Sequence, residues 1–133
     1  ERLSGRILLA EDGPDNQRLI SIILMKAGAQ VDIAENGQIA LRMLERANAV
    51  ATPYDIVITD MQMPVMDGYT LARSIRERGW QLPVVVLTAN AMPEERQRCI
   101  DAGCNDFNTK PINKQSLLKI CRHWMSPSVP CKN

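Results

Sequence analysis

Acidic, hydroxyl and basic side chains stand at the ends of short apolar runs in this sequence. Glu11 and Asp12 follow the first such run, and Asp60 follows another. Thr88 ends a third run, and Lys110 comes directly after a fourth run. In an open α/β sheet, ligands bind beyond the carboxyl ends of the parallel strands. If these runs are strands of one sheet, the five side chains converge at one edge of it.

The three carboxylates Glu11, Asp12 and Asp60 would repel one another in one cleft and raise one another's pKa values. A divalent cation removes that conflict. Mg2+ fits best, because it is a hard ion that takes one or two carboxylates, keeps several waters and bridges to phosphate oxygens. Lys110 would place a positive charge on a phosphoryl oxygen, and Thr88 offers a hydroxyl donor. The pattern therefore predicts a site for Mg2+ and a phosphoryl group.

Structural roles for the same residues stay open at this point. Glu11 and Asp12 could cap the first helix, and Asp60 could cap the third. Lys110 could form a salt bridge with Asp60 or Asp12, and Thr88 suits a strand end by propensity alone. Each explanation suffices for one residue, but together they leave the joint placement at four strand ends unexplained.

Five β-rich runs alternate with helical patterns along the chain. The runs are Arg6–Ala10, Gln30–Ala34, Asp55–Thr59, Val84–Thr88 and Asp106–Thr109. Three of them contain continuously apolar stretches, which are typical of strands covered on both faces of a parallel sheet. Strict alternation of strands and helices predicts an α/β fold with a parallel sheet and right-handed crossovers.

The helical patterns carry expectations of their own. They lie at Asp15–Ala27, after Asn36-Gly37, at Tyr69–Glu77, from near Pro93 to Gly103, and at Lys114–Met125, the last with Asn113 as its N-cap. The first carries Leu19, Ile22, Ile23 and Met25 or Lys26 at helical spacing, which indicates an apolar face. We expect the third to expose Arg76. The fourth has few strongly apolar residues, so we expect it to be the most weakly anchored.

Length, charge and cysteine content limit the class of protein. The 133 residues fit one domain, which we expect at residues 6–125, between a linker stub at 1–5 and a tail or linker at 126–133. The 16 basic and 15 acidic residues leave a net charge of +1, which argues against a nucleic-acid partner. No apolar run approaches the ~20 residues that cross a bilayer, so we expect no direct membrane contact. Four cysteines without a Cys-x-x-Cys pair favour free thiols in the cytoplasm, a location compatible with a membrane-anchored parent protein.

The segment Asp60–Gly68, Asp-Met-Gln-Met-Pro-Val-Met-Asp-Gly, resembles the phosphorylation segment of response-regulator receiver domains of two-component systems. It is most similar to the receivers of hybrid sensor histidine kinases. Three further motifs complete the pattern over nearly the whole chain: Glu11-Asp12, Thr88-Ala89, and Phe107 three residues before Lys110-Pro111. The resemblance implies a three-layer α/β/α, flavodoxin-like, doubly wound fold whose five-stranded parallel sheet has the order 2-1-3-4-5.

The resemblance also implies a role for each acidic residue. Asp60 would be the phosphorylated residue. Mg2+ would be bound by Asp12, Asp60 and the backbone carbonyl of Gln62. Glu11 would act through a metal-bound water.

The remaining motif residues would serve the phosphoryl group and the response to it. By the same resemblance, Thr88 and Lys110 bind the phosphoryl oxygens. Phe107 would rotate inward when Thr88 is drawn toward the phosphate. The peptide bond between Lys110 and Pro111 would be cis.

The function implied is that of a phosphoacceptor in a phosphorelay, which takes a phosphoryl group from a histidine kinase or a histidine phosphotransfer domain and switches conformation. Such a domain is not an enzyme in its own right, beyond self-catalysed phosphotransfer and slow autodephosphorylation. Two alternatives are a phosphohydrolase with an Asp nucleophile and a non-phosphorylated interaction module. The first typically has a second Asp where Gln62 stands, and the second would be expected to lack an acidic residue or the lysine. A relay role, a role within the kinase's own chain and a weak homodimer stay open.

Overall fold

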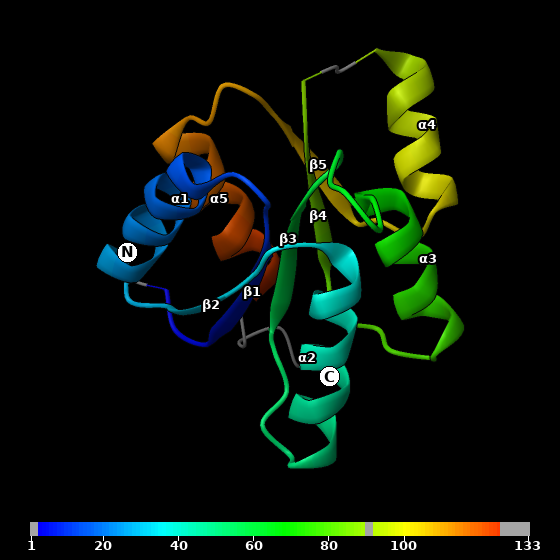
Figure 1. Cartoon of the computed structure of the whole chain (residues 1–133). Helices are drawn as coiled ribbons and strands as arrows, with labels where there is room; N and C mark the ends of the chain where they lie inside the picture. Colours follow the sequence, from blue (N-terminus) through cyan, green and yellow to red (C-terminus); the bar gives the residue numbers. More distant parts are fainter. Residues whose placement is uncertain (1–2, 90–91, 126–133) are drawn as a thin grey trace.

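Five parallel strands form one sheet between two layers of helices in the computed structural model, which describes residues 3–89 and 92–125 (Figure 1). The strand order is β2-β1-β3-β4-β5, and every pairing is parallel. This confirms the predicted flavodoxin-like fold and its strand order. In chain order the elements are β1 Arg6–Ala10, α1 Pro14–Lys26, β2 Gln30–Ala34, α2 Gly37–Ala49, β3 Ile56–Asp60, α3 Gly68–Glu77, β4 Val84–Thr88, α4 Pro93–Asp101, β5 Asp106–Thr109 and α5 Lys114–Met125.

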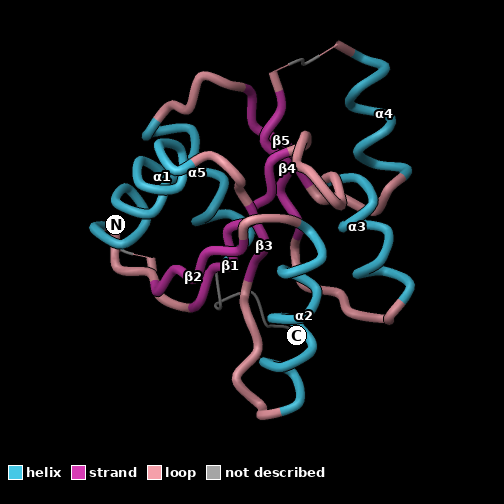
Figure 2. Tube along the Cα trace, viewed as in Figure 1, coloured by secondary structure: helices cyan, strands magenta, loops and turns pink. Residues whose placement is uncertain are grey.

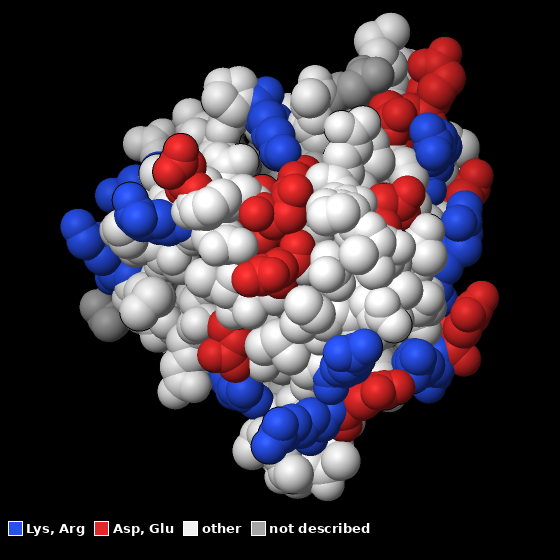
Figure 3. All heavy atoms as spheres, in the orientation of Figure 1, with Lys and Arg blue, Asp and Glu red and all other residues white. Residues whose placement is uncertain are grey.

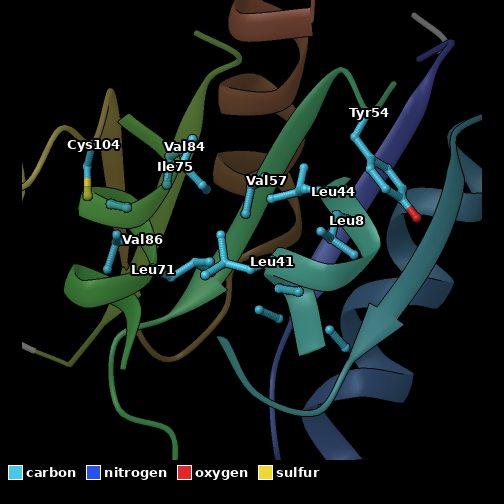
Figure 4. Close-up of a cluster of buried hydrophobic side chains, with 14 of the residues drawn as sticks. Leu8, Leu41, Leu44, Tyr54, Val57, Leu71, Ile75, Val84, Val86 and Cys104 are labelled. Atoms are coloured by element: carbon cyan, nitrogen blue, oxygen red, sulfur yellow. The ribbon is translucent and has the colours of Figure 1, made fainter. Parts of the chain in front are cut away.

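Alternate residues of β1, β2, β3 and β4 contribute to two hydrophobic cores. In β1, Ile7 and Leu9 pack with α1 and α5, whereas Leu8 and Ala10 pack with α2 and α3 on the other face. Figures 1 and 2 show α1 and α5 on one side of the sheet and α2, α3 and α4 on the other. The central strands must therefore be apolar on both faces, which is why their sequences are continuously apolar. Figure 4 shows part of the second core, with labelled side chains that include Leu8, Leu41, Leu44, Val57, Leu71, Ile75 and Val86.

Strand β3 lies one residue further along the chain than the predicted run Asp55–Thr59. Asp60 stays in register with Leu87 of β4, so the sheet continues up to Asp60. Asp55 lies outside the strand, and its Oδ2 accepts a hydrogen bond of 2.8 Å from the backbone N–H of Arg6. Asp60 is therefore the last residue of the strand, and the sheet holds its backbone in place.

The apolar face predicted for α1 is mostly exposed, and of its residues Ile23 packs against the core. Ile20 and Leu24 are fully buried, whereas Leu19 and Ile22 are each 46% exposed and Met25 is 58% exposed. Helix α1 is apolar on more than one side, so helical periodicity fits two different stripes equally well. The direction in which the chain leaves β1 decides which stripe meets the sheet. The other stripe remains as an apolar surface on the outside of the domain.

Arg76 is half-buried rather than exposed as predicted. Its guanidinium donates hydrogen bonds to the carbonyl oxygens of Gly103, Trp80 and Leu82 at 2.9, 2.8 and 3.0 Å, and to Oδ1 of Asn105 at 2.7 Å. Gly103 has a φ of +98°, and a Cβ at that position would lie 2.6 Å from Cγ of Arg76. The glycine thus lets the chain turn after α4 and leaves room for Arg76 to tie the end of α3 to the start of β5.

Helix α4 has the smallest apolar anchor of the five helices. Cys99 is the only buried residue among its nine, which agrees with its polar sequence. It begins at Pro93 and has no side-chain cap at its N-terminus, whereas α5 is capped as predicted by Asn113, whose Oδ1 accepts from the backbone N–H of Ser116 at 3.0 Å. Because so little apolar area holds α4, polar contacts matter more for its position than for the other helices.

The described part of the N-terminal segment is attached to the domain. Leu3, within the expected linker stub 1–5, is 4% exposed, and its backbone N–H donates to the carbonyl of Ala27 at 2.7 Å. The expected tail at 126–133 lies outside the described residues. None of the described helices is long and apolar enough to cross a membrane.

Candidate functional site

Glu11, Asp12 and Asp60 lie together at the carboxyl edge of the sheet. Strands β1 and β3 are hydrogen-bonded neighbours, so the loop after β1 meets the last residue of β3. One carboxylate oxygen from each residue lies within 4.8 Å of the other two. Acidic side chains gather near the middle of the face that Figure 3 shows. The convergence of these three carboxylates, predicted from the ends of the strands, is confirmed.

The electrostatics of this cluster favour a divalent cation. Glu11 and Asp60 are 2% and 5% exposed. Burial raises the pKa of Glu11, and the charges of Asp60 and Asp12 raise it further, although a hydrogen bond from the backbone N–H of Gly13 to its Oε2 (3.0 Å) acts against them. The other oxygen, Oε1, is buried and has no hydrogen-bond partner among the described residues. Oxygen ligands, like charges and an unpartnered buried oxygen suit a hard cation that keeps its waters.

Lys110 faces Asp60 across the edge of the sheet. Its Nζ lies 2.8 Å from Oδ1 of Asp60, and the Lys110 side chain is 30% exposed. The backbone N–H of Lys110 donates to the carbonyl of Thr88 at 2.8 Å, which aligns the ends of β4 and β5. The peptide bond between Lys110 and Pro111 is cis. The salt bridge left open by the sequence therefore exists, and it holds the ammonium beside the carboxylate.

A cavity of about 270 Å³ opens beside these groups. Thr88, Gln62 and Lys110 lie in its wall together with Asp60, and Thr88 is itself only 2% exposed. Phe107 lies instead in the neighbouring core, where the guanidinium of Arg96 sits 5.3 Å from its ring centroid. The full lining is Asp60, Met61, Gln62, Leu87, Thr88, Ala89, Glu95 and Lys110.

The chain after Asp60 packs tightly against the end of β3. The backbone N–H of Gly68 donates to the carbonyl of Met61 at 2.9 Å, and a Cβ on Gly68 would lie 2.5 Å from the carbonyl oxygen of Asp60. Asp67, not Asp60, caps α3, since its Oδ1 accepts from the backbone N–H of Thr70 at 2.8 Å. Asp60 is thus free of the capping role left open above, and its carboxylate faces the cavity.

One charged residue of the cavity wall, Glu95, was missed by the sequence interpretation. Glu95 lines the cavity, but its position in the first turn of α4 suggested only a favourable interaction with the helix dipole. The hydroxyl of Tyr69 donates a hydrogen bond to Oε1 of Glu95. The only signal in the sequence was an acidic residue soon after the strand that ends in Thr88, and it does not reveal which way the side chain points.

The fold and this edge of the sheet together define a receiver domain. Residues 7–122 match the response regulator receiver domain family, and the chain belongs to that family.

Sensor histidine kinases and a response regulator are among the proteins similar in sequence to this chain. The chain is 43% identical over 111 residues to the sensor histidine kinase RcsC of Salmonella typhi. The alignment covers 84% of this chain and 11% of that kinase. It is 40% identical over 114 residues to the two-component response regulator ORR41 of Oryza sativa subsp. japonica. That alignment covers 84% of this chain and 87% of the regulator. The chain therefore spans only about a tenth of the kinase relative but most of the regulator.

Solved structures match the fold closely. The receiver domain of the sensor histidine kinase PA1611 from Pseudomonas aeruginosa PAO1 has a TM-score of 0.80 and 38% identity, with 92% of this chain and 98% of that chain covered. That structure has a magnesium ion coordinated in the active site cleft. The receiver domain of Ssk1 from Saccharomyces cerevisiae, crystallised with the histidine phosphotransfer protein Ypd1, has a TM-score of 0.84 and 26% identity, with 93% of this chain and 90% of that chain covered.

Proposed function

We propose that this chain is a phosphoacceptor of a two-component phosphorelay, in which Asp60 takes a phosphoryl group from a phosphohistidine. The observation that carries the proposal is the joint placement of the charged groups. Oxygens of Glu11, Asp12 and Asp60 lie within 4.8 Å of one another, and Nζ of Lys110 lies 2.8 Å from Asp60. A carboxylate nucleophile between a cation-binding cluster and an ammonium group meets the needs of phosphoryl transfer, which are positioning and charge neutralisation.

The acidic cluster is the proposed metal site. Asp12, Asp60 and the backbone carbonyl of Gln62 would hold Mg2+, and Glu11 would act through a metal-bound water. The buried, unpartnered Oε1 of Glu11 supports this assignment, and so does the magnesium ion in the cleft of the PA1611 receiver. When bound, Mg2+ supplies positive charge to the phosphoryl oxygens.

The chemical step needs little proton transfer. A carboxylate oxygen of Asp60 attacks the phosphorus in line, and the new O–P bond forms as the P–N bond of the phosphohistidine breaks. The electron pair of the broken bond stays on the histidine nitrogen, and the product on Asp60 is an acyl phosphate. Lys110 exchanges its salt bridge with Asp60 for a phosphoryl oxygen, and the hydroxyl of Thr88 donates to another.

The proposed response begins at Thr88. Its movement toward the phosphoryl group makes room for Phe107, which rotates inward from beneath Arg96. Helix α4, held by Cys99 as its only buried residue, can then shift at low cost. Local charge changes of this kind typically bias a two-state element by about 1–3 kcal/mol.

The proposed docking surface for the phosphohistidine partner is the exposed apolar stripe of α1, formed by Leu19, Ile22 and Met25. Helix α1 starts at Pro14, directly after the acidic loop, so a partner on this stripe brings its histidine toward the cavity. The co-crystal of the Ssk1 receiver with Ypd1 supports a histidine phosphotransfer domain or kinase as the partner class.

Ile22→Lys should slow transfer from a phosphorylated histidine phosphotransfer protein by about tenfold, since an interface anchor typically contributes more than 1 kcal/mol. An equal loss of labelling by acetyl phosphate would contradict this docking surface.

We also propose a parent protein and a cellular location for this chain. The 43% identity to the receiver of a sensor kinase supports a place within a hybrid sensor histidine kinase. The free thiols of Cys99, Cys104 and Cys121 suit a cytoplasmic location, where thiols are kept reduced.

The proposed function is tested by incubating the chain with acetyl phosphate and measuring its intact mass. With Mg2+ we expect one phosphoryl group per chain, which hydroxylamine removes because it is an acyl phosphate. With a chelator in place of Mg2+ we expect no label. Labelling at the same rate without any divalent cation would contradict the proposal. Continuous turnover of a phosphomonoester without a stable label would favour the phosphohydrolase instead.

A further inference from the structure

The cavity beside Asp60 has a second acidic wall that phosphoryl transfer does not use. Glu95 of α4 lines the same cavity as Asp60 and Lys110, and its side chain is 16% exposed. It is not one of the three carboxylates that converge on the proposed metal site. A carboxylate that is this well shielded from water needs partners for its charge, and the partners of Glu95 lie on α3 and α4.

Both oxygens of Glu95 have a partner on α3 or α4. The hydroxyl of Tyr69, at the start of α3, donates to Oε1, and Nη1 of Arg98 lies 3.4 Å from Oε2. The guanidinium of Arg98 also lies 4.7 Å from the centroid of the Tyr69 ring. Sγ of Cys99 donates to the Tyr69 hydroxyl at 3.8 Å. One carboxylate thus connects the cavity wall to a small network that joins α3 to α4.

The two helices joined by this network differ in how well they are buried at the contact: Tyr69 of α3 is buried, whereas α4 is mostly exposed. Tyr69 is 3% exposed, and burial together with the neighbouring Glu95 raises its pKa, so the hydroxyl keeps its proton and remains a donor. On the other side, α4 is anchored by the single buried residue Cys99. The hydrogen bond between Tyr69 and Glu95 is one of a small set of polar and cation–π contacts between α3 and α4 among the described residues, beside those of Tyr69 with Cys99 and Arg98.

We propose that Glu95 is a phosphate-responsive latch, which holds α4 against Tyr69 of α3 until a phosphoryl group on Asp60 repels its carboxylate and weakens that contact. The inference rests on the proposed function, because Asp60 must accept the phosphoryl group. With Mg2+ bound both before and after transfer, formation of the acyl phosphate would raise the negative charge carried at Asp60 from one to about 1.5–2 at neutral pH. The side chains of Asp60 and Glu95 are only 8% and 16% exposed, so this extra charge acts on Glu95 with less screening than in bulk water. The latch is a second route to α4, separate from Thr88 and Phe107.

The latch is tested by amide hydrogen exchange of residues 93–101 in the whole chain, with Mg2+ in every sample and with acetyl phosphate either present or absent. In the native chain we expect phosphorylation to speed exchange in α4. Glu95→Gln keeps an acceptor oxygen for Tyr69 but carries no charge. We therefore expect near-native protection without phosphate and loss of most of the phosphate-induced increase. The exchange rate of α4 without acetyl phosphate distinguishes two effects of the substitution. Loss of charge alone should leave that rate near the native value, whereas a packing defect would raise it.

Two further variants isolate the contact. Glu94→Gln removes a charge from the same exposed helix turn but not from the cavity wall, so it should keep the full response to phosphate. Tyr69→Phe removes the donor, so α4 should exchange about tenfold faster before phosphorylation and change less after it. This variant removes only one hydroxyl from a buried ring, so the fold should survive.

The intact mass of each sample separates the two ways of failing. A native chain that acquires no phosphoryl group overturns the proposed function, and the latch with it. A native chain that is phosphorylated, while Glu95→Gln shows the same increase in α4 exchange, overturns the latch alone. Equal loss of the response in Glu94→Gln and Glu95→Gln also overturns it, because the charge at the helix terminus would then be the cause.

Discussion

Asp60→Asn abolishes phosphoryl uptake from acetyl phosphate and Mg2+, with a loss of at least about 100-fold in labelling rate. The amide has nearly the shape of the carboxylate but lacks the negative oxygen that attacks phosphorus. The side chain is 8% exposed and sits beside Lys110, so the variant also removes a salt bridge. It relieves repulsion from Glu11 and Asp12 at the same time, and for that reason we expect the fold to be retained. Intact mass and circular dichroism measure the two properties.

Asp67→Asn is the matched control for this variant. Asp67 lies in the same segment, and its Oδ1 caps α3 by accepting from Thr70. Asn is as good an N-cap as Asp, so this variant should fold and be labelled at the native rate. Labelling of Asp60→Asn at the native rate would show that another residue is the acceptor.

Lys110→Ala retains metal binding but loses most of the conformational response. In the native chain Nζ of Lys110 lies 2.8 Å from Asp60, where it would compete with a bound metal ion for the same carboxylate. Its removal should leave Mg2+ affinity equal or higher. Without the ammonium group, the phosphoryl oxygens lose one of their charged partners, and loss of one such preorganised donor typically slows the chemical step by about 10²–10³-fold. Titration with Mg2+, followed by labelling and by the NMR spectrum of α4, separates these effects.

Lys114→Ala provides the comparison for Lys110→Ala. Lys114 is exposed in the first turn of α5 and carries the same charge outside the cavity. We expect native labelling and a native response from it. A Lys110→Ala chain whose α4 spectrum changes on phosphorylation as fully as the native one would remove Lys110 from the switch.

The latch and the Thr88 route make different demands on α4. The proposed movement of Thr88 would act through the core around Phe107, whereas Glu95 would act through its hydrogen bond with Tyr69. A helix with one buried residue, Cys99, can respond to either. The Glu95→Gln and Lys110→Ala variants therefore report on two separable inputs to the same element.

Much of the site could be predicted because its residues sit where short apolar strands end. The strands β1, β3 and β4 are buried on both faces, so hydropathy alone locates them within one residue. The carboxyl ends of parallel strands meet at one edge. The residues at or directly after the ends of β1, β3 and β5, namely Glu11, Asp12, Asp60 and Lys110, were therefore expected together before any geometry was known.

The acidic cluster beside Lys110 and the alternation of strands and helices were thus determined by the sequence, since both depend on local periodicity and on the ends of strands. The buried face of α1, the half-buried position of Arg76 and the reach of Glu95 into the cavity were decided only by the tertiary structure. Each depends on how one element is rotated against another distant in the chain. For Glu95, the deciding contact is the hydroxyl of Tyr69, which is 26 residues away in the sequence.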